Sequence, residues 1–106
     1  MHKLIVLYPE PADRGAFIEY YESIHLPLAM KLPGLRSWRY STNISPDPEG
    51  RPTPYFAIFE AEFSDVAELQ AAMASPEGQA VAADVPNYAT GGALVLDYGL
   101  SGGSKA

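Results

Sequence analysis

The sequence contains no cysteine and few basic residues, and both shortages exclude classes of function. Without cysteine among its 106 residues, the chain has no disulfides, thiolate nucleophiles or thiolate metal sites. Seven basic and thirteen acidic residues give a net charge of −6, so we expect no binding to nucleic acid and none to a membrane surface. The apolar run Leu4 to Tyr8 is too short for a signal peptide or a membrane span. A cytoplasmic protein is therefore expected.

Histidine is scarce as well, and the glycines follow no nucleotide-binding pattern. The only histidines are His2 and His25, and their separation fits neither HxH nor HxxxH spacing. The glycine pairs at 91–92 and 102–103 lack both the GxGxxG spacing and its strand-to-helix setting. We therefore expect no metal and no cofactor, which leaves His25 as the one credible proton carrier.

Hydrophobic periodicity and turn residues indicate one domain at residues 1–100, followed by a flexible tail at 101–106. A loop with four prolines and a glycine separates two of the strands at 45–54. The expected strands are 2–8, 36–44, 55–63 and 92–98, and the expected helices are 13–31, 64–74 and 76–85. This order predicts an α+β fold of the ferredoxin-like type, β-α-β-β-α-β, with an antiparallel sheet covered by helices on one face.

Three of the four expected strands, 2–8, 55–63 and 92–98, are apolar on both faces. In the first strand Leu4, Val6 and Tyr8 alternate with Ile5 and Leu7. Helices cover only one face of such a sheet, so the other needs a partner. We expect a homodimer that packs sheet against sheet. The alternative is a monomer with an exposed aromatic patch.

His25 lies on the apolar edge of the first expected helix, four residues after Tyr21, so the two side chains share a face. Pro27 follows and should kink or end the helix beside the imidazole, because proline lacks a backbone donor and clashes with the preceding turn. Imidazole titrates near neutral pH and suits proton transfer. The alternative is a structural histidine that bonds backbone groups freed by Pro27.

The segment YYESIHLP (20–27) and the tripeptide PNY (86–88) resemble the EthD family, named after ethyl tert-butyl ether degradation. The resemblance extends from Lys3 to Tyr98. It implies the dimeric α/β-barrel form of the ferredoxin-like fold. The relatives it implies are small cofactor-free enzymes, namely monooxygenases of aromatic polyketides, lactone isomerases and dehydratases. The family histidine corresponds to His25.

The other candidate site residues are substrate-binding. Tyr21 qualifies by its spacing from His25, and Asn87 and Tyr88 by the family tripeptide, where their alternative is ordinary turn chemistry. Trp38 and Tyr40 share a strand face that an aromatic ligand could contact, although such pairs more often pack a core or an interface.

Two functions remain open on the sequence. The first is a cofactor-independent homodimeric enzyme acting on a small hydrophobic carbonyl or aromatic compound, with oxidoreductase as the class that the family label suggests. An isomerase or dehydratase is chemically as reasonable. The second is a non-catalytic binding or accessory protein for a hydrophobic degradation intermediate. Replacement of His25 separates them.

Overall fold

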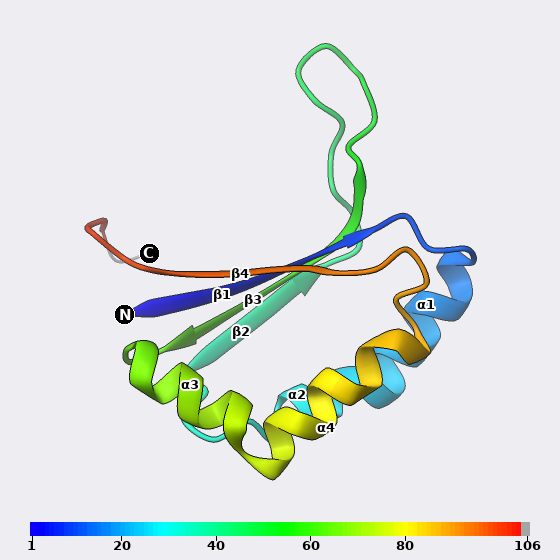
Figure 1. Ribbon diagram of the computed structural model, residues 1–106. Helices are drawn as coiled ribbons and strands as arrows, with labels where there is room; N and C mark the ends of the chain where they lie inside the picture. Colours follow the sequence, from blue (N-terminus) through cyan, green and yellow to red (C-terminus); the bar gives the residue numbers. More distant parts are fainter. Residues whose placement is uncertain (105–106) are drawn as a thin grey trace.

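The computed structural model describes residues 1–104 as a four-stranded sheet with helices on one side (Figure 1). The elements in chain order are β1 (His2–Pro9), α1 (Arg14–Tyr20), η1 (Tyr21–His25), α2 (Leu26–Ala29), β2 (Ser37–Ser41), β3 (Tyr55–Phe63), α3 (Val66–Ala74), α4 (Pro76–Asp84), η2 (Val85–Asn87) and β4 (Leu94–Gly99). Of the expected tail, 101–104 form no helix or strand and 105–106 lie outside the described residues.

The sheet has the order β2-β3-β1-β4, and all its neighbouring strands are antiparallel. The helices form one layer beneath it, and the loop between β2 and β3 projects from the sheet in the opposite direction (Figure 1). The ferredoxin-like α+β prediction is confirmed. β1 lies between β3 and β4, so side chains on its helix-facing side reach the middle of the molecule.

The first helical stretch differs from the expected kink at Pro27. It continues past the proline through three consecutive pieces, and the middle piece, η1, is a π-helix. The Leu26 amide donates to the Tyr21 carbonyl five residues back, which widens the turn just before the residue that has no amide hydrogen. Pro27 then occupies the first turn of α2, where a missing donor costs little.

Two other boundaries have local causes. Asp65 caps α3 with a carboxylate that accepts from the Glu68 amide, so this helix begins at Val66 and not at residue 64 as expected. β4 begins at Leu94, two residues later than expected, because the chain before it packs on the end of β1. A Cβ at Gly91 would lie 2.5 Å from the carbonyl oxygen of Glu10, so only glycine fits there.

The two faces of the sheet have different surroundings. Phe59, Ala61 and Phe63 of β3 and Leu4 and Tyr8 of β1 are buried under the helices. On the other face, register places Ile5 opposite Leu96 and Leu7 opposite Leu94. We call the apolar side chains there the outer patch: Ile5, Leu7, Ile58, Leu94, Leu96 and Tyr98. Its three β4 members are more than 40% exposed.

Candidate functional site

The π-helical turn places His25 on the inner side of the helix layer. The side chain is only 5% exposed. Its ring stacks on Tyr21 at a centroid distance of 5.4 Å and lies 4.5 Å from the ring of Tyr88. The predicted shared face of His25 and Tyr21 is therefore present, and π-helical turns of this kind are frequent at functional sites.

Asp84, the last residue of α4, fixes the orientation of His25. Its Oδ2 lies 2.9 Å from Nδ1 of His25. Its Oδ1 accepts hydrogen bonds from the Tyr20 hydroxyl at 2.5 Å and from the Asn87 amide at 3.0 Å. The carboxylate uses both oxygens, and Nε2 is the imidazole nitrogen left for other partners. We call these four residues the His25 cluster: Tyr20, His25, Asp84 and Asn87.

Burial and hydrogen bonding set the protonation states in this cluster. Burial lowers the pKa of His25 below its usual value, although the hydrogen bond with Asp84 and its charge act against this. Burial alone would raise the pKa of Asp84, but the bonds from Tyr20, Asn87 and His25 outweigh it and leave the pKa lowered. At neutral pH the cluster thus holds an ionised carboxylate and a neutral imidazole. An imidazole in that state accepts a proton.

A buried group of tyrosines adjoins the cluster. The hydroxyls of Tyr8 and Tyr88 are hydrogen-bonded at 2.7 Å, and either can be the donor. Burial raises the pKa of Tyr8, and of Tyr21 and Tyr88 more strongly, so all three phenols keep their protons. The Tyr21 hydroxyl is buried and has no hydrogen-bond partner among the described residues. Such an orphaned donor is uncommon in a core.

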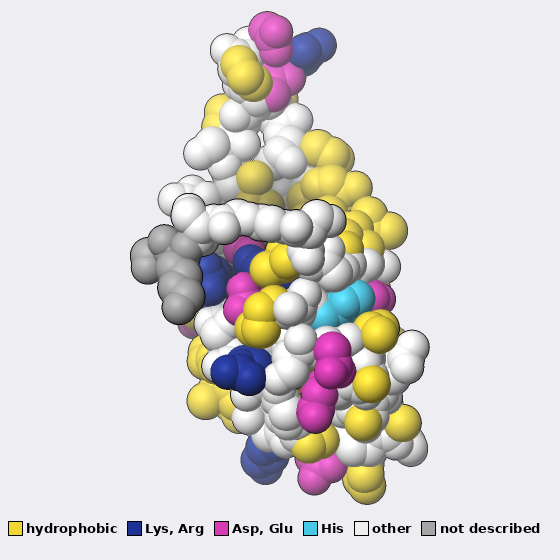
Figure 2. Space-filling model, turned by 90° about the vertical axis from the view of Figure 1, so that its left-hand side faces the viewer, with side chains coloured by type: hydrophobic (Ala, Val, Ile, Leu, Met, Phe, Trp, Pro, Cys, Tyr) yellow, Lys and Arg dark blue, Asp and Glu magenta, His cyan; other side chains and the backbone are white. Residues whose placement is uncertain are grey.

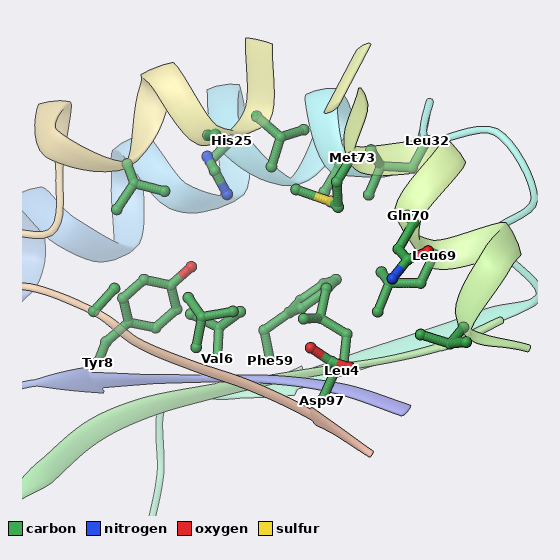
Figure 3. A pocket seen from close by; sticks show the side chains of 17 residues that line it. Leu4, Val6, Tyr8, His25, Leu32, Phe59, Leu69, Gln70, Met73 and Asp97 are labelled. Atoms are coloured by element: carbon green, nitrogen blue, oxygen red, sulfur yellow. The ribbon is translucent and has the colours of Figure 1, made fainter. Parts of the chain in front are cut away.

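A cavity of about 530 Å³ lies between the sheet and the helices, within the range of small-molecule sites. Figure 3 shows Tyr8, Val6, Phe59 and Leu4 rising from the sheet and His25, Met73 and Leu69 facing them from the helices. Most of the lining is aliphatic or aromatic. The polar side chains that line the cavity are Tyr8, His25, Gln70 and Asp97.

Of the candidate site residues, only His25 lines this cavity. Tyr21 and Tyr88 are packed behind the wall, and Asn87 bonds to Asp84 and Tyr20. The substrate-contact candidates on β2 lie elsewhere too. Trp38 is 37% exposed, and the Tyr40 hydroxyl donates to Glu22 at 2.6 Å.

Sequence reasoning did not identify Tyr8 and Asp84. Tyr8 is the last apolar residue before the Pro9 breaker, a position that places it at the end of a central strand. Asp84 begins the segment DVPNY, which already contained the family tripeptide. In both cases the partner lies more than 50 residues away, and nothing local indicates it.

Residues 1–104 contain no group of three or more His, Cys, Asp or Glu side chains that could hold a metal ion. The two His–Asp pairs, His25 with Asp84 and His2 with Asp97, each supply two ligand groups. None of the helices described is long and apolar enough to cross a membrane.

Residues 9–92 match the model of the EthD domain. An uncharacterised 11.0 kDa protein from the thcB–thcC intergenic region of Rhodococcus erythropolis is 38% identical over 96 residues, covering 91% of each chain. The crystal structure of an EthD family protein from Bacillus halodurans is 34% identical with a TM-score of 0.86, covering 94% of this chain and 98% of that one. A dimeric ferredoxin-like protein from Jannaschia is 28% identical with a TM-score of 0.66, covering 94% and 100%.

Proposed function

Because the chain belongs to the EthD domain family, we propose that it is a homodimeric, cofactor-independent enzyme with His25 as its proton-transfer group. Its substrate is a small hydrophobic carbonyl or aromatic compound. The observation that carries this proposal is the position of His25 in the wall of an apolar cavity, with Nδ1 held by a buried carboxylate.

The reaction class that this arrangement supports best is proton abstraction next to a carbonyl group. An α C–H bond of the substrate breaks, the proton moves to Nε2 of His25, and the electron pair becomes the enolate. Asp84 keeps the imidazole in one orientation and stabilises the imidazolium that forms, as a buried carboxylate does for catalytic histidines elsewhere. If the proton on Nε2 is first replaced by one from solvent, its delivery to the same carbon exchanges the α hydrogen of the substrate. Delivery of the proton to another carbon isomerises the substrate.

Tyr8 is the group that we assign to the substrate oxygen. Its hydroxyl points from the sheet toward the helix that carries His25 (Figure 3). When Tyr88 donates to Tyr8, the Tyr8 hydrogen is free for an oxygen in the cavity. In a dry, low-dielectric site such a donor stabilises the developing enolate more than water would. Asn87 then acts through Asp84, and Tyr88 acts through Tyr8, so both are positioning residues.

The outer patch is the dimer interface in this proposal. Leu94, Leu96 and Tyr98 are 41–46% exposed on one strand face, and in Figure 2 hydrophobic side chains gather along one flank below the projecting loop. The related Jannaschia protein is described as dimeric. We expect Leu96→Glu to reduce the sedimenting mass from twice 11.4 kDa to the single-chain value. Met30→Glu, a matched change at an exposed residue of the helix layer, should leave the dimer intact.

A second function is supported by the scarcity of polar groups in the cavity. A binding or accessory protein for a hydrophobic intermediate needs such a pocket and no proton carrier. The two functions differ in one testable respect. Replacement of His25 would leave ligand binding by an accessory protein unchanged, but it would remove the activity of the enzyme. Cofactor-independent oxygenation, isomerisation and dehydration of a carbonyl compound can each begin with this proton abstraction, so the test addresses that step.

The test is deuterium incorporation into 4-phenylbutan-2-one in D₂O, followed by NMR. We expect the wild-type protein to accelerate exchange of the α protons, and His25→Gln to lower the rate about 10²–10⁴-fold, the usual contribution of general acid–base catalysis. Ser23→Gln places the same side chain on the exposed side of the same turn and should keep the wild-type rate. Exchange at the wild-type rate in His25→Gln would make His25 structural and contradict the mechanism. A wild-type protein that binds the ketone without accelerating exchange would favour the accessory-protein function.

A further inference from the structure

A second polar group lines the same cavity, far from His25. Asp97 of β4 and Gln70 of α3 both line the cavity, and neither belongs to the His25 cluster. Figure 3 shows both side chains turned toward the space between sheet and helices, on the side opposite Tyr8 and His25. The wall between the two groups consists of aliphatic and aromatic side chains such as Val6 and Phe59.

Asp97 is held in place and still has an oxygen free. Its Oδ1 lies 2.6 Å from Nε2 of His2, which is the one side-chain partner recorded for it among residues 1–104. The His2 side chain is 11% exposed and that of Asp97 is 45% exposed. A nearly buried imidazole therefore holds one oxygen of a carboxylate that lines the cavity, and the second oxygen has no hydrogen-bond partner among residues 1–104. The exposed Gln70 side chain also lines the cavity and has no hydrogen bond within the described residues.

Strand register gives the separation of the two polar ends. Asp97 lies opposite Leu4 on β1, and Tyr8 lies four residues further along that strand. Four residues of extended chain span about 13 Å. A single elongated molecule of moderate size can thus contact Tyr8 and His25 at one end and Asp97 and Gln70 at the other.

We propose that the substrate carries a hydroxyl group at the end remote from its carbonyl, and that Asp97 and Gln70 bind this hydroxyl. This inference rests on the proposed function only in placing the carbonyl beside His25. The hydroxyl donates to the free oxygen of Asp97 and accepts from the Gln70 amide. His2 is a positioning residue, because it touches Asp97 and not the substrate.

A hydroxyl fits this pair of side chains better than the charged alternatives. A hydroxyl offers one donor and two lone pairs, which match one carboxylate acceptor and one amide donor. An ammonium group would donate to Asp97 and to the carbonyl oxygen of Gln70, but it would lose its hydration beside an aliphatic and aromatic wall, which costs more than burying a hydroxyl. A carboxylate would meet the charge of Asp97 in a chain whose net charge is already −6.

The competing explanation is a purely structural pair. His2 and Asp97 lie diagonally on neighbouring strands, and such pairs contribute to sheet stability without any ligand. That explanation predicts no preference for a hydroxylated ligand. Binding measurements therefore separate the two explanations without reference to turnover.

The experiment compares 4-(4-hydroxyphenyl)butan-2-one with 4-phenylbutan-2-one by calorimetry. They share one carbon skeleton and differ only in the terminal hydroxyl. We expect the wild-type protein to bind the hydroxylated ketone about tenfold more tightly, as expected for one hydrogen bond to a charged group. Asp97→Leu should bring the ratio of dissociation constants close to one, and Gln70→Leu should reduce it to about threefold.

Glu19→Leu removes an exposed carboxylate from α1 and serves as the control that keeps the tenfold ratio. Equal binding of the two ketones, no binding of either, or a preference that survives in Asp97→Leu would overturn the inference. If Asp97→Leu does not fold, Gln70→Leu tests whether the preference for the hydroxylated ketone depends on these two side chains. If the protein prefers the hydroxylated ketone but does not accelerate α-proton exchange, the proposed function is refuted and this inference stands. If it accelerates exchange but shows no preference for the hydroxylated ketone, this inference is refuted and the proposed function stands.

Discussion

The two His–Asp pairs of this protein lie at opposite ends of one cavity and differ in their access to water. His25 and Asp84 have side chains 5% and 8% exposed, and tyrosines surround them. In the pair His2 and Asp97 the imidazole is nearly buried, but the carboxylate is 45% exposed on an edge strand. The same two residue types thus form a closed end and an open end.

This difference in exposure suits the two ends to different roles. At the closed end, three donors occupy the buried carboxylate. The neutral imidazole faces a cavity lined mostly by apolar side chains, where charge developing on a substrate interacts strongly with its neighbours. At the open end, one oxygen of Asp97 and the amide of Gln70 have no hydrogen-bond partner among the described residues, which suits recognition of a polar group. Four substitutions or conditions test this contrast, from the largest expected effect to the smallest.

Asp84→Asn should have the largest effect. An amide cannot accept from Tyr20, His25 and Asn87 at once without leaving buried groups poorly paired, so we expect a loss of about 2–4 kcal/mol in the free energy of unfolding. Urea denaturation measures it. Asp65→Asn is the matched control, since asparagine caps a helix as well as aspartate does, and its cost should stay below about 0.5 kcal/mol. Equal costs for the two variants would contradict the buried network.

Acidification should destabilise the protein through His25. The folded-state pKa of His25 is lowered, so below about pH 6.5 the unfolded chain takes up a proton that the folded chain does not. The neutral imidazole contributes its full share to the free energy of unfolding above about pH 6.5. As the pH falls from there to the folded-state pKa, this contribution decreases by at most about 1.4 kcal/mol per pH unit. Urea denaturation at pH 7.5 and 5.5 should show a smaller loss in His25→Gln than in the wild type. Identical losses would contradict the neutral buried state.

The adjacent tyrosines of the closed end should respond oppositely to loss of the hydroxyl. Tyr20→Phe removes a donor to Asp84 and should cost about 1–2 kcal/mol of unfolding free energy. Tyr21→Phe removes a buried hydroxyl without a recorded partner in residues 1–104, so it should be neutral or stabilising within about 0.5 kcal/mol. The two variants control for each other in thermal and urea unfolding. A cost above about 1.5 kcal/mol for Tyr21→Phe would reveal a hydrogen bond that the structure lacks.

Asp97→Asn should have the smallest effect on stability. Its partner contact is short, but the carboxylate is half in solvent, where an ion pair contributes about 0–1 kcal/mol. In urea denaturation, Asp97→Asn should lower the free energy of unfolding clearly less than Asp84→Asn does. A cost as large as that of Asp84→Asn would remove the distinction between a structural closed end and a ligand-accessible open end.

The sequence was sufficient to predict the fold because the fold depends on local patterns, and a local pattern also made His25 the catalytic candidate. Alternating strands, helix caps such as Ser75 and the breaker at Pro9 define the order of elements. His25 was the one histidine in a helical context. The widened turn before Pro27 was not predictable, because periodicity does not distinguish a kink from a π-helical turn.

The partners of His25 and the shape of the cavity could not be predicted because they depend on contacts distant in sequence. His25 and Asp84 are 59 residues apart, Tyr8 and Tyr88 are 80 apart, and His2 and Asp97 are 95 apart. Only the folded sheet brings them together. For the same reason, spacing on a helix placed Tyr21 beside His25, and spacing on a strand placed Tyr40 beside Trp38, without showing that neither tyrosine lines the cavity.

The central claim is that the closed end holds a neutral imidazole whose Nε2 is a free base in the cavity. Nitrogen-15 NMR of the two histidines at pH 7.5 tests it most directly, with the spectrum of His25→Gln for assignment. We expect His25 to carry its proton on Nδ1 and its Nε2 resonance to shift when 4-phenylbutan-2-one is added. A proton on Nε2, or a charged ring at that pH, would contradict it.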